Sequence, residues 1–468
     1  MPFLLNLFPS LNLVFPDILS ILVLFTLIIV KNFSKENYAK QLLSKISLLA
    51  TVTLLVAMLI YVSNTNEKTT ELFIYNKTIG QIKILLFFCL FVFLGFLNYT
   101  KLNKTLNENF FILIYGIVNA LTLSVSANSF LTLILALEIY TFSLAFLLLN
   151  EHDDIFHKKC AMRFLMFSSI ASSIFIFGCS LIYSQSGSLT FTNIKSVNGL
   201  IPEMGQVLIV CYILFKLGCV PFHSWLIDIY EKLSSTTILF LEAIWKLFMM
   251  FVFIKIFSVF ANTDCLKIIL VAFSVIAMGI GAIMPIFQNN IHKFVASISI
   301  GHIGFAISSL HIVQSEPAIM EYMSYNSLAI FCLFVAILFI KNYCPIKTFA
   351  DLSGIIKTSP TLGFTILASM FALCGIPPFG NFIAKVNIFK LLLCGRSYFV
   401  LTVAILYSLI SVVYLIKWSR YFFYTQNMEN VVKNKNYILS IFLFIILTIS
   451  IIFYEQIFMY FEIALATK

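Results

Sequence analysis

Charged residues are scarce in this sequence. Only 11% of the 468 residues are Asp, Glu, Lys or Arg, whereas a soluble domain carries about 25%. This scarcity excludes an ordinary soluble protein, a nucleic-acid module and a disordered chain. No connecting stretch is long enough to form a separate soluble domain.

Ligand clusters and cofactor motifs are also lacking. The ten cysteines form no C-x-x-C pair and no group with histidine, which argues against an iron–sulfur or zinc site and against a disulfide scaffold. A Gly-rich nucleotide loop is absent as well. Residues 2–30 have no basic n-region and enter an apolar segment directly, so no cleavable signal peptide is expected.

Apolar residues make up 61% of the chain, and the mean hydropathy is +1.01. Since one span needs about 20 apolar residues, the composition predicts an all-α polytopic membrane protein with about fourteen transmembrane helices. The predicted spans are 13–30, 46–63, 82–98, 109–126, 129–149, 161–184, 205–226, 236–259, 265–287, 294–313, 322–340, 360–389, 398–423 and 437–463. The segment 360–389 is too long for one plain span.

Lysine and arginine are distributed unevenly over the two sides of these spans. Loops after odd-numbered spans carry eighteen of them, and the other side carries eight, including Lys83. Because basic loops stay in the cytoplasm, both termini are predicted to lie outside it. The net charge of +10 then reflects cytoplasmic loops that face anionic lipid. Lys255 lies near a span end and belongs clearly to neither group.

Three further lysines, Lys216, Lys246 and Lys385, lie inside apolar segments. A buried ammonium group in a membrane is costly and by default indicates a function. Snorkelling toward the interface is the alternative for each lysine alone. Three such residues together favour a shared purpose.

The segments 218–226 and 375–383 both read G-x-x-P-F-x-x-aromatic-aliphatic. They lie in spans seven and twelve, an odd number of spans apart, so their orientations are predicted to be opposite. Pro221, Pro377 and Pro378 remove backbone donors and interrupt the helices, which a membrane tolerates only beside protein or a polar cavity. Inverted repeats with broken helices are typical of transporters. Two ordinary proline kinks are the alternative.

The predicted organisation is a pair of inverted five-helix repeats, spans four to eight and nine to thirteen. Broken helices seven and twelve occupy corresponding places in them. The predicted parts are three N-terminal helices at 1–108, a first repeat at 109–259, a second repeat at 260–424 and a last helix at 425–468.

Span five carries one acid, Glu138, with no other charge within twelve residues on either side. A lysine beside it would allow it to ionise. When Asn128 is aligned with Asn290, the counterpart of Glu138 in span ten falls near His302, which is either a second titratable group or a packing residue. Glu138, Lys216, Lys246, His302 and Lys385 would together form a row of groups that can exchange protons.

Several motifs occur in the order found in the antiporter-like subunits of respiratory NADH:quinone oxidoreductase (complex I). They are S-A-N-x-F-L-x-L-x-x-x-L-E at 126–138, F-K-L and P-F-H-x-W with D-x-Y-E within 215–231, K-x-x-x-S-x-S-I-x-H-x-G at 293–304, and G-I-P-P with F-I-x-K within 375–385. The sequence resembles this family over spans four to thirteen, and the termini agree only in hydropathy. A lysine at 385 and an end after span fourteen resemble the subunit N group, which includes mitochondrial subunit 2, rather than subunits M or L.

The resemblance implies roles for these residues. Glu138 would pair with Lys216, Lys246 would connect the two halves, and Lys385 would lie in the half-channel toward the outer side. The chain would be a proton-translocating subunit of this translocase without a redox cofactor, because other subunits would bind NADH, flavin, iron–sulfur clusters and quinone. Its partners would be other membrane-arm subunits, including neighbouring antiporter-like subunits, in a bacterial inner membrane rather than a mitochondrial one.

The sequence departs from the family pattern before Lys246, where small residues and proline are usual. Here Glu242 precedes Lys246 by four residues, the order of a favourable helical ion pair. Such a pair would hold Lys246 charged, whereas a Glu242 that faced lipid would leave it free to titrate. Two other functions stay open: a subunit of a multisubunit cation/proton antiporter, and a structural membrane subunit without a proton path.

Overall fold

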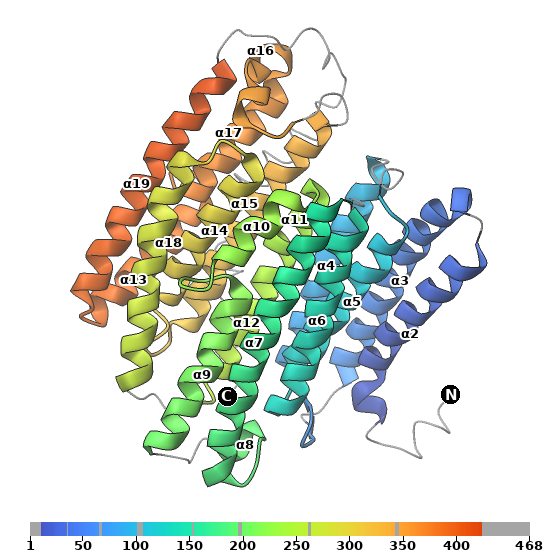
Figure 1. The fold of residues 1–468 in the computed structure, drawn as a ribbon, viewed down its shortest axis with the longest axis vertical. Helices are drawn as coiled ribbons and strands as arrows, with labels where there is room; N and C mark the ends of the chain where they lie inside the picture. The colour runs from blue at the N-terminus through green and yellow to red at the C-terminus, as the bar shows by residue number, and fades with distance from the viewer. Residues whose placement is uncertain are drawn as a thin grey trace. The chain divides into compact units, whose positions relative to one another are not determined.

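A computed structural model of the chain describes residues 11–34, 36–64, 68–100, 106–151, 154–194, 199–260, 264–341 and 346–423. These residues are almost entirely helical (Figure 1). Eleven of the described helices are long and apolar enough to cross a membrane, which confirms the prediction of an all-α polytopic membrane protein. The predicted last span, 437–463, lies outside the described residues.

The chain divides into two compact units, and the first contains residues 1–209 and 255–261. Its helices are α2 (Leu11–Phe33), α3 (Glu36–Asn64), α4 (Lys77–Tyr99), α5 (Asn109–Ser126), α6 (Phe130–Glu151), α7 (Ile155–Ser186), α8 (Phe191–Ile194) and the first part of α9 (Leu200–Leu217). A short antiparallel hairpin of β1 (Lys68–Thr69) and β2 (Ile74–Tyr75) joins α3 to α4. Within it, α5 packs on α6, α3 on α4, and α6 on α7.

The second unit contains residues 210–254 and 262–466. Its elements are the second part of α9, α10 (Ser224–Lys232), α11 (Ser235–Phe240), the π-helix η2 (Leu241–Trp245), most of α12 (Lys246–Phe257), α13 (Asp264–Phe287), α14 (Ile291–Ile307), α15 (Glu316–Lys341), the 3-10 helix η3 (Phe349–Leu352), α16 (Ile355–Thr358), α17 (Pro360–Cys374), α18 (Gly380–Cys394) and α19 (Tyr398–Phe423). Within it, α13 packs on α14 and α19, and α15 packs on α17 and α18.

Local sequence signals set several helix ends. Asn76, Ser234 and Asn290 cap α4, α11 and α14, because each side-chain oxygen accepts a hydrogen bond from a backbone N–H of the first turn. Gly187 ends α7 with a φ of 65°, which favours glycine. Pro360 begins α17, where a helix does not need the missing N–H.

Two helix junctions share one backbone pattern. The first junction joins α5 to α6 at residues 128–130, and the second joins α13 to α14 at residues 289–291. A crossing segment exchanges two N–H···O=C bonds with each of them, 189–191 with the first junction and 347–349 with the second. Each crossing segment then forms one helical turn, α8 or η3. This correspondence supports the predicted repeat, whose boundaries stay a prediction.

A lysine completes each junction. Lys255 Nζ donates to the carbonyl oxygens of Val125 and Ala127 at 2.7 and 2.6 Å, and Lys417 Nζ donates to that of Ile286 at 2.6 Å. Carbonyl groups at the end of a helix lack backbone donors and form the negative end of the helix dipole. Both ammonium groups are therefore stabilised where α5 and α13 end.

Candidate functional site

Two helices break at the repeated motif, as predicted. The first break separates α9 from α10, and the second separates α17 from α18. Gly218 and Gly375 lie at the breaks with φ values of 75° and 70°, a region that glycine adopts freely. The two breaks share three backbone hydrogen bonds. In each, the glycine N–H donates to the carbonyl three residues earlier, and the N–H of the next residue donates to the carbonyl five residues earlier. The N–H of the residue four positions after the glycine donates to the carbonyl three residues before itself. The peptide bonds before Pro221 and Pro378 are both cis.

Side chains from the second half-helix bind carbonyls of the first. Trp225 Nε1 donates to the Phe215 carbonyl at 3.1 Å, and Asn381 Nδ2 donates to the Ala372 carbonyl at 2.9 Å. Phe215 and Ala372 each precede their motif glycine by three residues. In each break, a different side chain thus adds a second hydrogen bond to the same carbonyl position, which already accepts one from the backbone N–H of the motif glycine.

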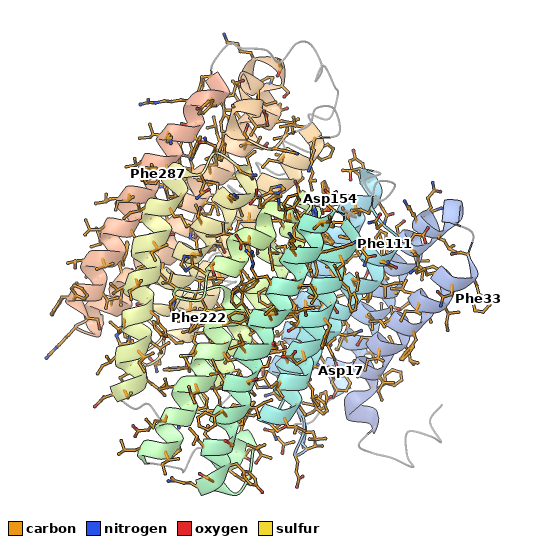
Figure 2. The ribbon with its side chains drawn as sticks, in the orientation of Figure 1. Asp17, Phe33, Phe111, Asp154, Phe222 and Phe287 are labelled. Atoms are coloured by element: carbon orange, nitrogen blue, oxygen red, sulfur yellow. The ribbon has the colours of Figure 1, made fainter. Side chains whose placement is uncertain are left out.

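The prolines of both breaks lie at the surface of the chain. Pro221, Pro377 and Pro378 are exposed, and Figure 2 shows Phe222 beside the first break. At membrane depth, irregular backbone is tolerated only where protein or water covers it. Both breaks therefore require a neighbouring protein or a hydrated path.

Lys216 is fully buried in the last turn of α9. Its Nζ lies 5.2 Å from the centre of the Tyr212 ring, a distance that suits a cation–π contact. The position at the C-terminal end of a helix also favours a positive charge. The helix thus offers two sources of stabilisation for a charge within the membrane.

Glu138 lies on α6 in the first unit and is partly exposed. The hydroxyl of Ser172, on α7, donates a hydrogen bond to its carboxylate. A hydroxyl can stabilise this carboxylate without neutralising it. The pairing of Glu138 with Lys216 stays a prediction.

Lys246, Glu242 and Ser299 form a closed, buried cluster in the second unit. Lys246 Nζ donates to a carboxylate oxygen of Glu242 and to the Ser299 hydroxyl, which in turn donates to the other Glu242 oxygen at 2.8 Å. The Tyr230 ring centre lies 5.3 Å from Lys246 Nζ. Glu242 therefore does not face lipid, and the structure brings it together with Lys246 as an ion pair.

His302 is buried on α14 among aromatic side chains. Its Nδ1 lies 2.5 Å from the hydroxyl of Tyr322 and 3.4 Å from that of Tyr407. Within the described residues, its Nε2 has no hydrogen-bond partner. His302 thus belongs to a polar network, and its part in proton transfer stays a prediction.

Lys385 is buried on α18, and its Nζ donates to the carbonyl of Cys374, the last residue of α17, at 2.7 Å. Its ammonium group also lies 5.6 Å from the ring centre of Tyr407, which links it to the network of His302. A Cβ atom at Gly375 would lie 2.6 Å from Lys385 Cδ, so any larger residue would displace this side chain. Lys385 therefore reaches back to the carbonyl end of the first half-helix.

The junctions change the expected counterpart of Glu138. Their shared hydrogen bonds align Asn128 with Asn289, one residue earlier than the alignment with Asn290. Glu138 then corresponds to Ser299 and not to a position near His302. The sequence alignment was wrong because two asparagines are adjacent, and only the backbone pairing distinguishes them.

A buried ion pair in the first unit was not predicted. Lys83 Nζ, on α4, lies 2.6 and 2.7 Å from the two carboxylate oxygens of Asp17, on α2. The Tyr75 hydroxyl donates to the same carboxylate at 2.9 Å. Lys83 therefore does not lie in an outer loop, as its place in the charge count assumed. Without it the outer side carries seven basic residues, and the predicted asymmetry becomes larger.

In the part of the chain that the structure describes, no group of three or more His, Cys, Asp or Glu side chains could hold a metal ion.

Comparison with known proteins identifies the family. The family model described as "NADH:quinone oxidoreductase/Mrp antiporter, TM" matches residues 127–411. This chain belongs to that family. The matched region includes both junctions, both helix breaks and all five predicted relay residues.

Curated relatives of this family member support the resemblance to subunit N. A protein of Pelagibacter ubique (strain HTCC1062) named NADH-quinone oxidoreductase subunit N is 29% identical over 437 residues, which are 90% of this chain and 91% of the relative. A protein of the same name from Herminiimonas arsenicoxydans is 28% identical and covers 81% of this chain and 82% of its own length.

Solved structures share the fold of this family member. A chain of respiratory complex I from Thermus thermophilus matches with a TM-score of 0.78 and 17% identity, over 94% of this chain and 98% of the other. A chain of the Mrp complex from Dietzia sp. DQ12-45-1b matches with a TM-score of 0.83 and 14% identity, over 97% of both chains. At such identities the likeness establishes the fold alone.

Proposed function

We propose that this multi-pass membrane protein is the proton-translocating subunit N of a bacterial NADH:quinone oxidoreductase. One observation carries the proposal: Lys216, Lys246 and Lys385 are all buried within apolar helices, each beside a helix break or a π-helical turn. Burying three ammonium groups in a membrane is too costly to serve packing alone. The name that the curated relatives carry supplies the complex in which these lysines act.

The proposed mechanism begins at Glu138 and Lys216. A change of charge that passes along the membrane arm alters the attraction between them. When that attraction weakens, Lys216 is left at the end of α9 with less compensation and releases its proton, because an unpaired buried charge is strongly disfavoured. The proton then moves through water toward Lys246 and Lys385 and leaves on the outer side.

Lys246 acts in this mechanism as part of its pair with Glu242. Both charges are buried, and Ser299 closes the cluster. A proton that arrives can protonate the carboxylate while the ammonium group donates one onward, so the pair, rather than the lysine alone, is the exchanging unit. Water carries the proton on either side of the cluster.

Under this proposal the chain needs no redox group of its own. Electron transfer from NADH to quinone takes place in other subunits, and this chain couples to it by contact within the membrane arm. The exposed prolines of the two helix breaks support such partners, since a neighbouring subunit or enclosed water must cover them. Both termini lie on the non-cytoplasmic side.

A subunit of a multisubunit cation/proton antiporter is the second candidate. The family description itself includes Mrp antiporters, and the Mrp chain matches nearly the whole fold. The identity of the co-purifying proteins separates the two candidates. A purely structural subunit is the third candidate, and it predicts that proton transport does not depend on Lys216.

The proposal is tested by placing this chain in a bacterial complex I from which the resident subunit N has been removed. Membranes are extracted in mild detergent, and the co-purifying subunits are identified. Inverted vesicles are then assayed for NADH oxidation and for protons translocated per NADH. Lys216→Met and Glu138→Gln are compared with Lys158→Met, a matched change of a lysine on α7 outside the relay.

Co-purification with NADH-oxidising subunits is expected, and both relay variants should assemble but lose most of their proton-coupled quinone reduction. Pumping at the level of the unmodified chain in both variants would overturn the relay. Co-purification with small antiporter subunits alone would favour the second candidate.

A further inference from the structure

Glu321, on α15, is a buried carboxylate that the sequence did not single out. Its side chain is 0% exposed in the second turn of the helix. Oε2 accepts a hydrogen bond from Asn387 Nδ2, on α18, at 3.0 Å. Oε1 is buried and has no hydrogen-bond partner in the described residues. The group therefore retains one oxygen that is ready to accept a proton.

The other buried carboxylates of the described residues are bound differently. Asp17 is paired with Lys83, and Glu242 is paired with Lys246. A carboxylate in such a pair can lose its charge only by leaving a buried ammonium group uncompensated. Glu321 is held by a neutral amide instead, so it can take up and release a proton without breaking an ion pair.

The position of Glu321 places it beyond the second helix break. Tyr325, one turn along α15, packs against Gly380 at the start of α18, and Glu321 meets Asn387 further toward the end of α18. At 1.5 Å per residue, Asn387 lies about 10 Å along α18 from Gly380. Lys385 is two residues before Asn387. The carboxylate thus lies between the level of Lys385 and the end of the helix.

Polar groups continue to that end. Ser397, which follows α18, lies 2.8 Å from Nε2 of His311, in the turn between α14 and α15. His311 is only partly buried, and its Nδ1 has no hydrogen-bond partner in the described residues. The distribution of basic residues predicts that this end faces the outer side. A carboxylate and an imidazole therefore lead from the level of Lys385 to the surface.

We propose that Glu321 is the proton acceptor of the outer half-channel, the step that follows Lys385. The Lys385 ammonium group loses a proton to water as its N–H bond breaks, and the water passes a proton to Oε1 of Glu321, where an O–H bond forms. The neutral acid then releases the proton to water near His311. This step rests on the proposed function.

The test uses the assembled complex that carries this chain. Glu321→Gln keeps an oxygen that can accept the Asn387 hydrogen bond and nearly the same shape, but it cannot carry the proton. Glu321→Asp keeps the acid. Glu316→Gln, one turn earlier on the same helix and only partly buried, is the matched control. Protons translocated per NADH and the amount of assembled complex are measured together.

Glu321→Gln is expected to lower proton translocation about tenfold at normal assembly, with partial recovery in Glu321→Asp and no change in Glu316→Gln. Normal pumping in assembled Glu321→Gln overturns the inference. If Lys216→Met and Lys385→Met still abolish pumping in that case, the proposed function stands; if they do not, the proposed function fails as well.

A spectroscopic readout keeps the inference falsifiable if Glu321→Gln assembles poorly. Infrared difference spectra of the turning-over complex should contain a carboxylic-acid C=O band that shifts in Glu321→Asp and persists unchanged in Glu316→Gln. A spectrum in which no such band shifts in Glu321→Asp would refute the assignment, because a packing role requires no change of protonation.

Discussion

The first and second junctions have the same backbone hydrogen bonds but carry different side chains on the helices that follow them. Ten residues beyond the aligned asparagines at 128 and 289, α6 carries Glu138 and α14 carries Ser299. Glu138 accepts a bond from a hydroxyl, whereas Ser299 binds a complete ion pair. The same backbone junction is therefore followed by a carboxylate in α6 and by a hydroxyl bound to an ion pair at the equivalent position of α14.

The two helix breaks differ in a similar way. Lys216 precedes its break by two residues, whereas Lys385 follows the glycine of its break by ten. Even so, Lys385 reaches back to a carbonyl at the end of α17, and Lys216 lies in the last turn of α9. In both breaks, an ammonium group therefore lies near the C-terminal end of the first half-helix. In the first break a residue of that half-helix supplies it, and in the second break a residue of the following half-helix does.

The largest effect is expected from breaking the cluster around Ser299. Glu242→Ala leaves the buried Lys246 without its counter-charge, which costs about 3–5 kcal/mol, so little complex should assemble. Ser299→Ala removes only a hydroxyl and should cost about 1 kcal/mol. The effect of each variant is measured as the amount of complex in the membrane and as the thermal denaturation of that complex.

A double variant sharpens this prediction. Glu242→Ala with Lys246→Met removes both charges, and replacing a whole buried pair by apolar groups is often close to neutral. Assembly should therefore recover, while proton pumping should not. Equal assembly in the single and double variants would show that the ion pair has no stabilising role.

The next effect concerns the lysines of the two junctions. Lys255→Met removes donors to two carbonyl groups, and Lys417→Met removes a donor to one. Since a hydrogen bond to a charged group contributes about 1.5–3 kcal/mol, the first junction should lose more stability. Hydrogen exchange of the segments 189–194 and 347–352 reports each junction separately. Arginine at either position should preserve most of the protection, and identical loss at both junctions would contradict the comparison.

A smaller effect distinguishes the two breaks. Alanine at Gly218 or Gly375 must adopt a positive φ, which costs about 1–2 kcal/mol. At Gly375 the new Cβ would also meet the alkyl chain of Lys385 at 2.6 Å, whereas at Gly218 it would meet Leu226 Cδ2 at 2.9 Å. We expect the Gly375→Ala variant to be about as stable as the Gly218→Ala variant but to pump fewer protons. Equal pumping in the two variants would mean that the position of Lys385 is not critical.

The smallest effect is a pH dependence of the second junction. Burial alone would raise the pKa of Asp351, but hydrogen bonds from the backbone N–H groups of Lys347 and Thr348 lower the pKa below its ordinary value. A lowered pKa stabilises the fold above the ordinary value, and the gain is lost as pH falls through the pKa of the folded state. Asn193, the counterpart at the first junction, does not titrate.

Acidification below about pH 4 should therefore increase hydrogen exchange in 347–352 but leave 189–194 unchanged. The effect should stay under about 1 kcal/mol, because Asp351 is exposed to solvent. Asp351→Asn should remove the pH dependence. A pH response of equal size at both junctions would exclude Asp351 as its source.

Composition and local pattern determined much of this protein by themselves. Runs of apolar residues predicted the long membrane-crossing helices between α2 and α19, since a membrane requires every backbone group within a span to be satisfied locally. The motif G-x-x-P-F predicted both breaks, because glycine and proline restrict the backbone at the position where they stand. The buried lysines could be found for the same reason: a charge inside an apolar run is a local anomaly.

Only the tertiary structure decided which groups meet. The predicted span starting at 322 left Glu321 at its edge, whereas α15 begins at Glu316 and buries it against Asn387. The charge count likewise places Lys83 in a loop, whereas the structure pairs it with Asp17. Residues near a span end can face either water or a neighbouring helix. Hydropathy records only the neighbours along the chain, and the energy of a charge depends on its neighbours in space.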